Sequence, residues 1–152
     1  MQPRRRYARS AIAVLAAIGA LAGPAYADVS LAGIGMGHGA PSMESFRQFQ
    51  AAVHQYDASG ERFRIDTHCP SACTMFLAIR NVCITPGATL AFHAGGNSRG
   101  GTPNASISAQ MMSTYKPSLR KYLNSNHVME RFEFHTISGD DMVKRFGYAA
   151  CR

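Results

Sequence analysis

The stretch from Arg62 to His93 constrains the fold of this chain more than any other feature. A strand-like segment ends at a tight turn that contains Pro70 and Ser71, and the apolar segment after this turn predicts a buried helix. Two further short apolar runs, separated by a Pro-Gly turn, predict two more strands. Because the second of these runs ends at His93, 22 residues after Ser71, a hydroxyl and an imidazole can meet at one edge of a sheet.

The rest of the chain continues the alternation of strands and helices. Helical spacing of apolar side chains predicts an amphipathic helix over residues 43–56, and Pro117 is expected to interrupt a second helical region over residues 106–124. The other expected elements are strands over residues 29–34, 62–67, 82–85 and 89–92, a helix over 71–79, a helical turn within 127–134, and a last helix from Ser138 to Gly147. This alternation predicts an α/β domain.

The first 27 residues have the composition of a secretory signal peptide. Four arginines precede an apolar run of 14 residues, and Ala25-Tyr26-Ala27 has the small-x-small form of a cleavage site. An uncleaved N-terminal anchor is the alternative, but the apolar run is short for a membrane span. We therefore predict an exported protein, periplasmic or secreted, with one mature domain over residues 28–152 and no membrane attachment after cleavage.

Charge and motifs limit the classes of partner. The formal net charge is +7 for the whole chain, but residues 28–152 contain 12 Lys and Arg against nine acidic residues, a net charge of +3. Since this mature part has no basic run with interleaved aromatic residues, we expect no nucleic-acid partner. No motif in the chain indicates a cofactor.

The four cysteines are expected to form disulfides, because an exported protein meets an oxidising compartment. Cys69, Cys73, Cys83 and Cys151 allow three complete pairings, and the sequence does not choose among them. A zinc site made of His68, Cys69, Cys73 and Cys83 is the alternative, although the spacing between the first two cysteines is not that of a common structural zinc site. We favour disulfides and predict no metal.

The turn at Ser71 and the segment before His93 together resemble the Clp-protease/crotonase superfamily. The resemblance is closest to exported bacterial Clp-protease-like proteins with a Cys-x-Ser-Ala-Cys motif, and it covers residues 33–92. In that superfamily a proline precedes the base histidine by seven residues, as Pro86 precedes His93 here. The resemblance implies a single ββα-spiral domain in which Ser71 is the nucleophile and His93 is the base.

The resemblance also implies roles for residues around this pair. A glycine-rich loop in the family supplies one oxyanion N–H, which assigns Gly37 and Gly39 to that role, and the residue after the nucleophile, Ala72, supplies the other. The segment that holds the third catalytic residue in the family offers Glu133 or His135, and we take Glu133 as the candidate. Asp140 and Asp141 are instead expected in the first turn of a helix, where negative charge is favourable.

Two departures from the family pattern concern the N-terminal half of the domain. The family loop has two adjacent glycines, whereas His38 separates Gly37 from Gly39 here. The family also has a further strand and helix before this loop, and the mature chain is too short to hold them. We therefore expect a domain that is trimmed at its N-terminus, with a coding sequence that starts further upstream as the alternative.

These residues predict a serine hydrolase of the peptidase type, with a peptide or small acyl substrate, and the resemblance implies a homo-oligomer. A non-catalytic envelope protein that keeps the fold for binding or assembly is the main alternative, and acyl-coenzyme A chemistry is a third. Each site residue also has a structural alternative. Ser71 would be a helix N-cap, His93 a histidine capped by a backbone carbonyl at a strand end, and Glu133 a solvated charge paired with Arg131 or Lys144.

Overall fold

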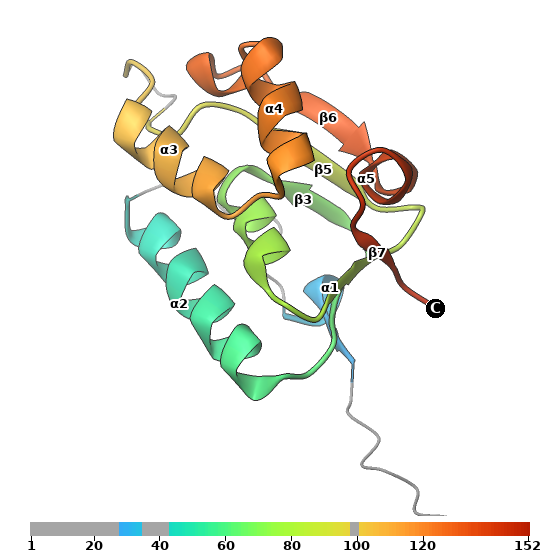
Figure 1. Ribbon diagram of the computed structural model, residues 1–152. Coiled ribbons are helices and arrows are strands. Elements are labelled where there is room, and N and C mark those ends of the chain that lie inside the picture. The colour runs from blue at the N-terminus through green and yellow to red at the C-terminus, as the bar shows by residue number, and fades with distance from the viewer. Residues whose placement is uncertain (1–27, 35–42, 98–100) are drawn as a thin grey trace, which may run out of the picture.

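The computed structural model describes residues 28–34, 43–97 and 101–152 (Figure 1). The predicted signal peptide, Gly37 and Gly39 lie outside these residues. In chain order the elements are β1 (Val29–Ser30), α1 (Leu31–Ile34), α2 (Met43–Ser59), β2 (Phe63–Ile65), β3 (His68–Pro70), the 3-10 helix η1 (Ser71–Ala78), β4 (Val82–Ile84), β5 (Thr89–Phe92), α3 (Ala105–Ser113), α4 (Pro117–Ser125), the 3-10 helix η2 (Val128–Glu130), β6 (His135–Ser138), α5 (Gly139–Lys144) and β7 (Ala149–Ala150). The predicted α/β class is confirmed.

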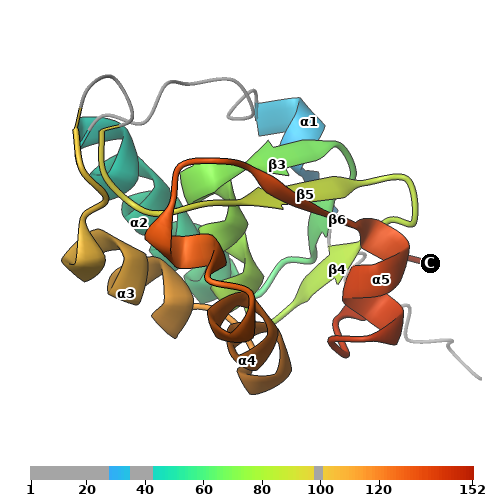
Figure 2. The same ribbon diagram turned by 90° about the horizontal axis from the view of Figure 1, so that it is seen from above.

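The strands form two small sheets, and the chain passes from one to the other twice in the same way. The first sheet has the order β1-β2-β4-β7 and is parallel throughout, whereas the second has the order β3-β5-β6. In the second sheet β3 is parallel to β5, and β6 is antiparallel to β5; these three strands lie side by side in Figure 2. The chain therefore contains two successive units of strand, strand and helix: β2-β3-η1 and β4-β5-α3.

The burial of side chains along β4 and β2 agrees with the central positions of these strands in the first sheet. Every residue of β4 is buried, as expected of a strand that has neighbours on both sides in a parallel sheet. In β2 the side chains of Phe63 and Ile65 are buried and that of Arg64 is less so, which is the alternation of a half-covered strand. Gly139 follows β6, and its N–H donates to the carbonyl of Ala88 just before β5.

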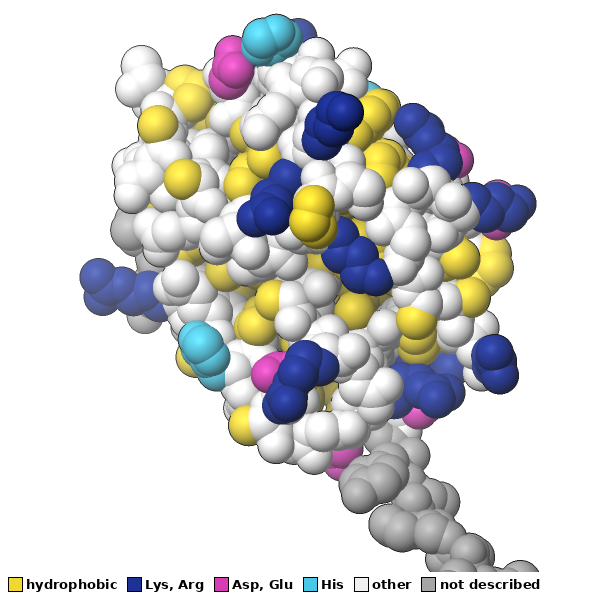
Figure 3. Space-filling model, in the orientation of Figure 1, with side chains coloured by type: hydrophobic (Ala, Val, Ile, Leu, Met, Phe, Trp, Pro, Cys, Tyr) yellow, Lys and Arg dark blue, Asp and Glu magenta, His cyan; other side chains and the backbone are white. Residues whose placement is uncertain are grey.

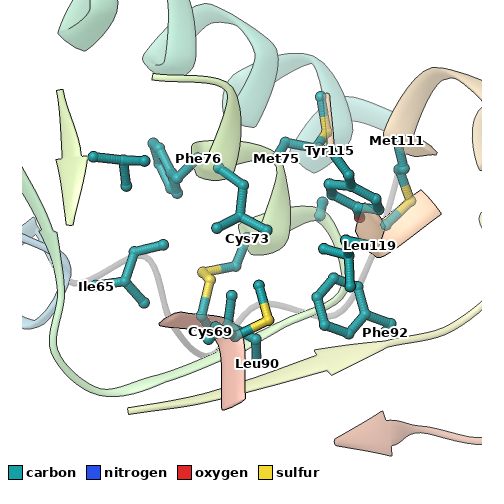
Figure 4. Packing of buried hydrophobic residues seen from close by; sticks show 14 of the residues in the cluster. Ile65, Cys69, Cys73, Met75, Phe76, Leu90, Phe92, Met111, Tyr115 and Leu119 are labelled. Carbon is teal, nitrogen blue, oxygen red and sulfur yellow. A yellow bond between two sulfur atoms is a disulfide. The ribbon is translucent and has the colours of Figure 1, made fainter. Parts of the chain in front are cut away.

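The helix η1 lies at the centre of the core, where it contacts α2, α3, β3, β4 and β5. Phe76 of η1 stacks on Phe63 of β2 with ring centroids 4.5 Å apart, and Phe49 of α2 meets it edge-on at 5.7 Å. Figure 4 shows the neighbouring part of this core, in which Phe92 of β5 lies close to Tyr115. Because η1 is buried among these side chains, the position of its first residue is fixed by the core.

Most predicted elements are confirmed, with differences at their ends. The helix α2 runs three residues beyond the predicted end, and the predicted break at Pro117 separates α3 from α4. The predicted strand over 29–34 is wrong beyond Ser30, because Leu31 begins a helical turn whose side chain enters the core. The predicted strand over 62–67 corresponds to β2, and the separate strand β3 before Ser71 was not predicted. Nor were β6 and β7, since each is short and depends on pairing with a distant strand.

The expected disulfides are present as Cys69–Cys73 and Cys83–Cys151. The alternative zinc site is wrong, because all four sulfur atoms are paired. Within the described part of the chain no group of His, Cys, Asp and Glu has the arrangement of a metal site. Nor does any helix there have the length and apolarity that crossing a membrane requires.

Basic side chains on the face seen in Figure 3 are spread singly, with polar and apolar surface between them. On α5 the charges are balanced locally. Lys144 pairs with Asp140 at 2.7 Å, and Arg145 lies 3.6 Å from Asp141. Both aspartates occupy the first turn of α5, as predicted, and the Ser138 hydroxyl caps this helix by accepting from the Asp141 N–H at 3.1 Å.

Candidate active site

Ser71 occupies a strained turn at the end of β3. Its φ is +55°, in the left-handed region, and apart from glycines only His127 shares a positive φ among the described residues. A left-handed residue with a side chain costs about 1–2 kcal/mol, and such strain persists only where the surroundings enforce it. The turn therefore points to a specific requirement at Ser71 rather than to ordinary chain reversal.

The helix N-cap alternative for Ser71 is wrong. The N-cap of η1 is Pro70, which is extended with φ −91° and ψ 154°, and no side chain makes a cap hydrogen bond there. Ser71 is instead the first residue of the helix. Its hydroxyl is therefore not used to satisfy the helix N-terminus, and its side chain is only half-buried.

His93 lies just beyond the end of β5 and is almost completely enclosed. Its exposed fraction is 3%, and the rings of Phe132 and Phe134 lie 6.2 and 4.7 Å from its own between centroids. Neither ring nitrogen has a hydrogen-bond partner among the described residues. Burial lowers the pKa of His93, and the nearby backbone of Ala94 offsets part of this shift. The lowered pKa favours the neutral imidazole, the state in which this ring accepts a proton.

The register of β3 and β5 brings Ser71 and His93 to the same edge of one sheet. The strands are parallel and pair Pro70 with Ala91, so Ser71 is the first residue after β3 and His93 is the first residue after β5, which ends at Phe92. Neighbouring strands are about 4.8 Å apart. The structure does not join the two side chains by a hydrogen bond, and such bonds are often long in enzymes without substrate.

Of the three predicted oxyanion donors, the structure describes Ala72 but not Gly37 or Gly39. Ala72 is the second residue of η1 and is buried, and a backbone N–H in a first helical turn has no partner within its own helix. Its position directly after Ser71 is the one expected of an oxyanion donor. Gly37 and Gly39 belong to the undescribed link between α1 and α2, so their role stays a prediction.

The third catalytic residue stays a prediction. Glu133 is exposed and lies between the two phenylalanines whose rings contact His93, but it makes no hydrogen bond to that imidazole. The ion pair suggested with Lys144 is not formed, because Lys144 binds Asp140. His135 is engaged elsewhere, with Nε2 2.9 Å from the Tyr122 hydroxyl.

Sequence reasoning missed a buried pair of hydroxyls behind Ser71. The Thr74 hydroxyl donates to the Ser71 carbonyl at 2.6 Å, and the Tyr115 hydroxyl lies 2.5 Å from the same Thr74 oxygen. Since Thr74 gives its proton to the carbonyl, Tyr115 is the donor in the second bond. Burial raises the pKa of Tyr115 well above its usual value, so this hydroxyl stays protonated. The spacing of Thr74 from Ser71 could have suggested the first bond, but nothing in the sequence indicates Tyr115.

No protein-family model matches this chain, and no curated protein matches it.

Proposed function

We propose that this chain is an exported serine hydrolase in which Ser71 is the nucleophile and His93 the general base. The observation that carries the proposal is the left-handed turn at Ser71 at the same sheet edge as a buried imidazole, whose two nitrogens have no partner among the described residues. A strained serine at a strand-to-helix turn is a recurring way to expose a nucleophile. A buried polar group without a partner, in turn, requires an explanation, which substrate or Ser71 would supply.

The proposed reaction uses one proton carrier for both half-reactions. The Ser71 Oγ attacks the substrate carbonyl carbon while His93 accepts the hydroxyl proton, and the Ala72 N–H donates to the oxyanion. His93 then gives its proton to the leaving group as the acyl-enzyme forms. Water, deprotonated by His93, attacks the acyl carbon, and the proton returns to Ser71 as the acid leaves.

The strand arrangement supports the ββα-spiral fold of the Clp-protease/crotonase superfamily. In the two strand–strand–helix units β2 is parallel to β4 and β3 is parallel to β5, so the second unit repeats the first with each strand beside its counterpart. We further propose a peptide or small acyl substrate and a homo-oligomer on the same resemblance. The two disulfides support export to an oxidising compartment.

A non-catalytic binding or assembly protein is the second candidate, and one observation favours it. An imidazolium formed at His93 during catalysis would be buried, and none of the described carboxylates hydrogen-bonds to this ring to stabilise it. In serine hydrolases an acidic residue orients and stabilises the histidine. If this chain lacks that group, the fold can still serve recognition.

Reaction with a fluorophosphonate probe separates the two candidates. Purified residues 28–152 are incubated with the probe, and intact mass is measured beside Ser71→Ala, His93→Ala and the exposed control Ser113→Ala, with folding checked by circular dichroism. We expect one adduct on the native chain and on Ser113→Ala, and none on the other two variants. A folded native chain without an adduct would overturn the hydrolase proposal and support a binding role.

A further inference from the structure

We propose that the Cys69–Cys73 disulfide is a positioning device for Ser71, and that its main effect is on the reactivity of this serine rather than on global stability. The inference deepens the proposed function and rests on it. The bridge joins the residue two positions before Ser71 to the residue two positions after it. It therefore closes a five-residue loop around the one described serine with a positive φ.

The bridge connects two rigid parts of the fold across the turn. Cys69 is the middle residue of β3 and pairs with Leu90, whereas Cys73 lies in the first turn of η1. Both half-cystines are buried, with exposed fractions of 0% and 1%, and Figure 4 shows their sulfur atoms within the apolar core. Since neither end can move without disturbing the core, the Cα positions on both sides of Ser71 are set 5.3 Å apart.

The bridge acts together with the Thr74 hydroxyl bond described above, but on a different part of the turn. Thr74 holds the Ser71 carbonyl, on the helix side, at 2.6 Å. The disulfide limits the separation of strand and helix, and hence the direction in which the Ser71 side chain leaves the turn. Without the bridge, the relaxed turn is free to return Ser71 to an ordinary negative φ, because left-handed backbone is unfavourable for serine.

The second disulfide offers a matched control with the opposite balance of effects. In the chain-entropy account a bridge stabilises more when it closes a longer loop. Cys83–Cys151 spans 68 positions and ties the last residues of the chain to β4, whereas Cys69–Cys73 spans four. Loss of the long bridge should therefore lower the melting temperature more, while loss of the short bridge should lower the reactivity of Ser71 more.

The test measures the rate of fluorophosphonate labelling and the melting temperature of three chains: native, Cys69→Ala/Cys73→Ala and Cys83→Ala/Cys151→Ala. We expect labelling of the first double variant to slow about tenfold or more, because small displacements of a reacting group have effects of that size. The pH midpoint of labelling should stay at the native value, since His93 is unchanged. The control variant should label within about twofold of the native rate despite its lower melting temperature.

The experiment gives different results if the inference fails and if the proposed function fails. A native chain that is folded and does not label overturns the proposed function and the inference with it. A native chain that labels, with the Cys69→Ala/Cys73→Ala variant labelling at the same rate, overturns the inference alone. If that variant does not fold, Cys69→Val/Cys73→Ala restores part of the lost volume, and unfolding of both would show that the bridge serves the whole fold, which also contradicts the inference.

Discussion

Replacement of Thr74 by valine tests the hydroxyl pair behind Ser71. The change keeps the shape of the side chain but removes two hydrogen bonds, to the Ser71 carbonyl at 2.6 Å and to the Tyr115 hydroxyl at 2.5 Å. The Tyr115 hydroxyl would remain in the core without this partner, since Tyr115 is 3% exposed, and the Ser71 carbonyl would lose its bond at a part-buried position. A buried polar group left without a partner costs about 1–3 kcal/mol. We therefore expect Thr74→Val to lower the free energy of unfolding by about 2–3 kcal/mol.

A double-mutant cycle with Tyr115→Phe gives the decisive comparison. Tyr115→Phe removes one hydrogen bond but leaves Thr74 bonded to the Ser71 carbonyl. Urea unfolding should therefore show a decrease of about 1 kcal/mol in the free energy of unfolding. The double variant has no orphaned tyrosine hydroxyl, and its loss should fall short of the sum of the single losses by about 1 kcal/mol. Thr114→Val is the matched control, because Thr114 also donates to a carbonyl three residues earlier, at 2.6 Å, but is only part-buried. Additivity within about 0.3 kcal/mol would refute a shared bond between the two hydroxyls.

Three further predictions concern His93 and one glycine. Burial holds the pKa of His93 in the folded chain below its value in the unfolded chain, so the unfolded chain binds the proton more strongly. The contribution of His93 to the free energy of unfolding should therefore be fully present above about pH 6.5 and should be lost as the pH falls through the folded-state pKa. Urea midpoints at pH 7.5 and 5.5 should show a smaller difference in His93→Gln than in the native chain, and equal differences would contradict this. Phe134 is 59% exposed, yet its ring contacts the His93 imidazole. Phe134→Ala should therefore admit water to the imidazole and raise the pKa of His93, as measured by NMR. An unchanged pKa would mean that other groups bury this ring. Gly139→Ala should destabilise the chain by several kcal/mol, since a Cβ would lie 2.0 Å from the Thr85 carbonyl oxygen. The control Gly87→Ala has open space around the added Cβ and should unfold at nearly the native urea concentration. A native urea midpoint for Gly139→Ala would show that the backbone can shift at this position.

Local patterns in the sequence predicted the elements that depend on neighbouring residues. Apolar spacing located α2, proline located the break between α3 and α4, and the Ser-Gly-Asp-Asp sequence located the start of α5. These predictions succeed because helix periodicity, capping and the missing proline N–H act within a few residues. The strands β6 and β7 escaped prediction because their stability comes from β5 and β4, which lie far away in the sequence.

The sequence alone also determined which groups could form the candidate site, since the turn at Ser71 and the strand before His93 are local features. Only the tertiary structure decided how those groups are used. The register of β3 against β5 places Ser71 and His93 at one sheet edge, the connection from β3 into the buried helix η1 gives Ser71 a positive φ, and the rings of Phe132 and Phe134, about 40 residues further along the chain, enclose His93. The pairing of the four cysteines was likewise open in the sequence, because it depends on which strand and helix ends meet in space.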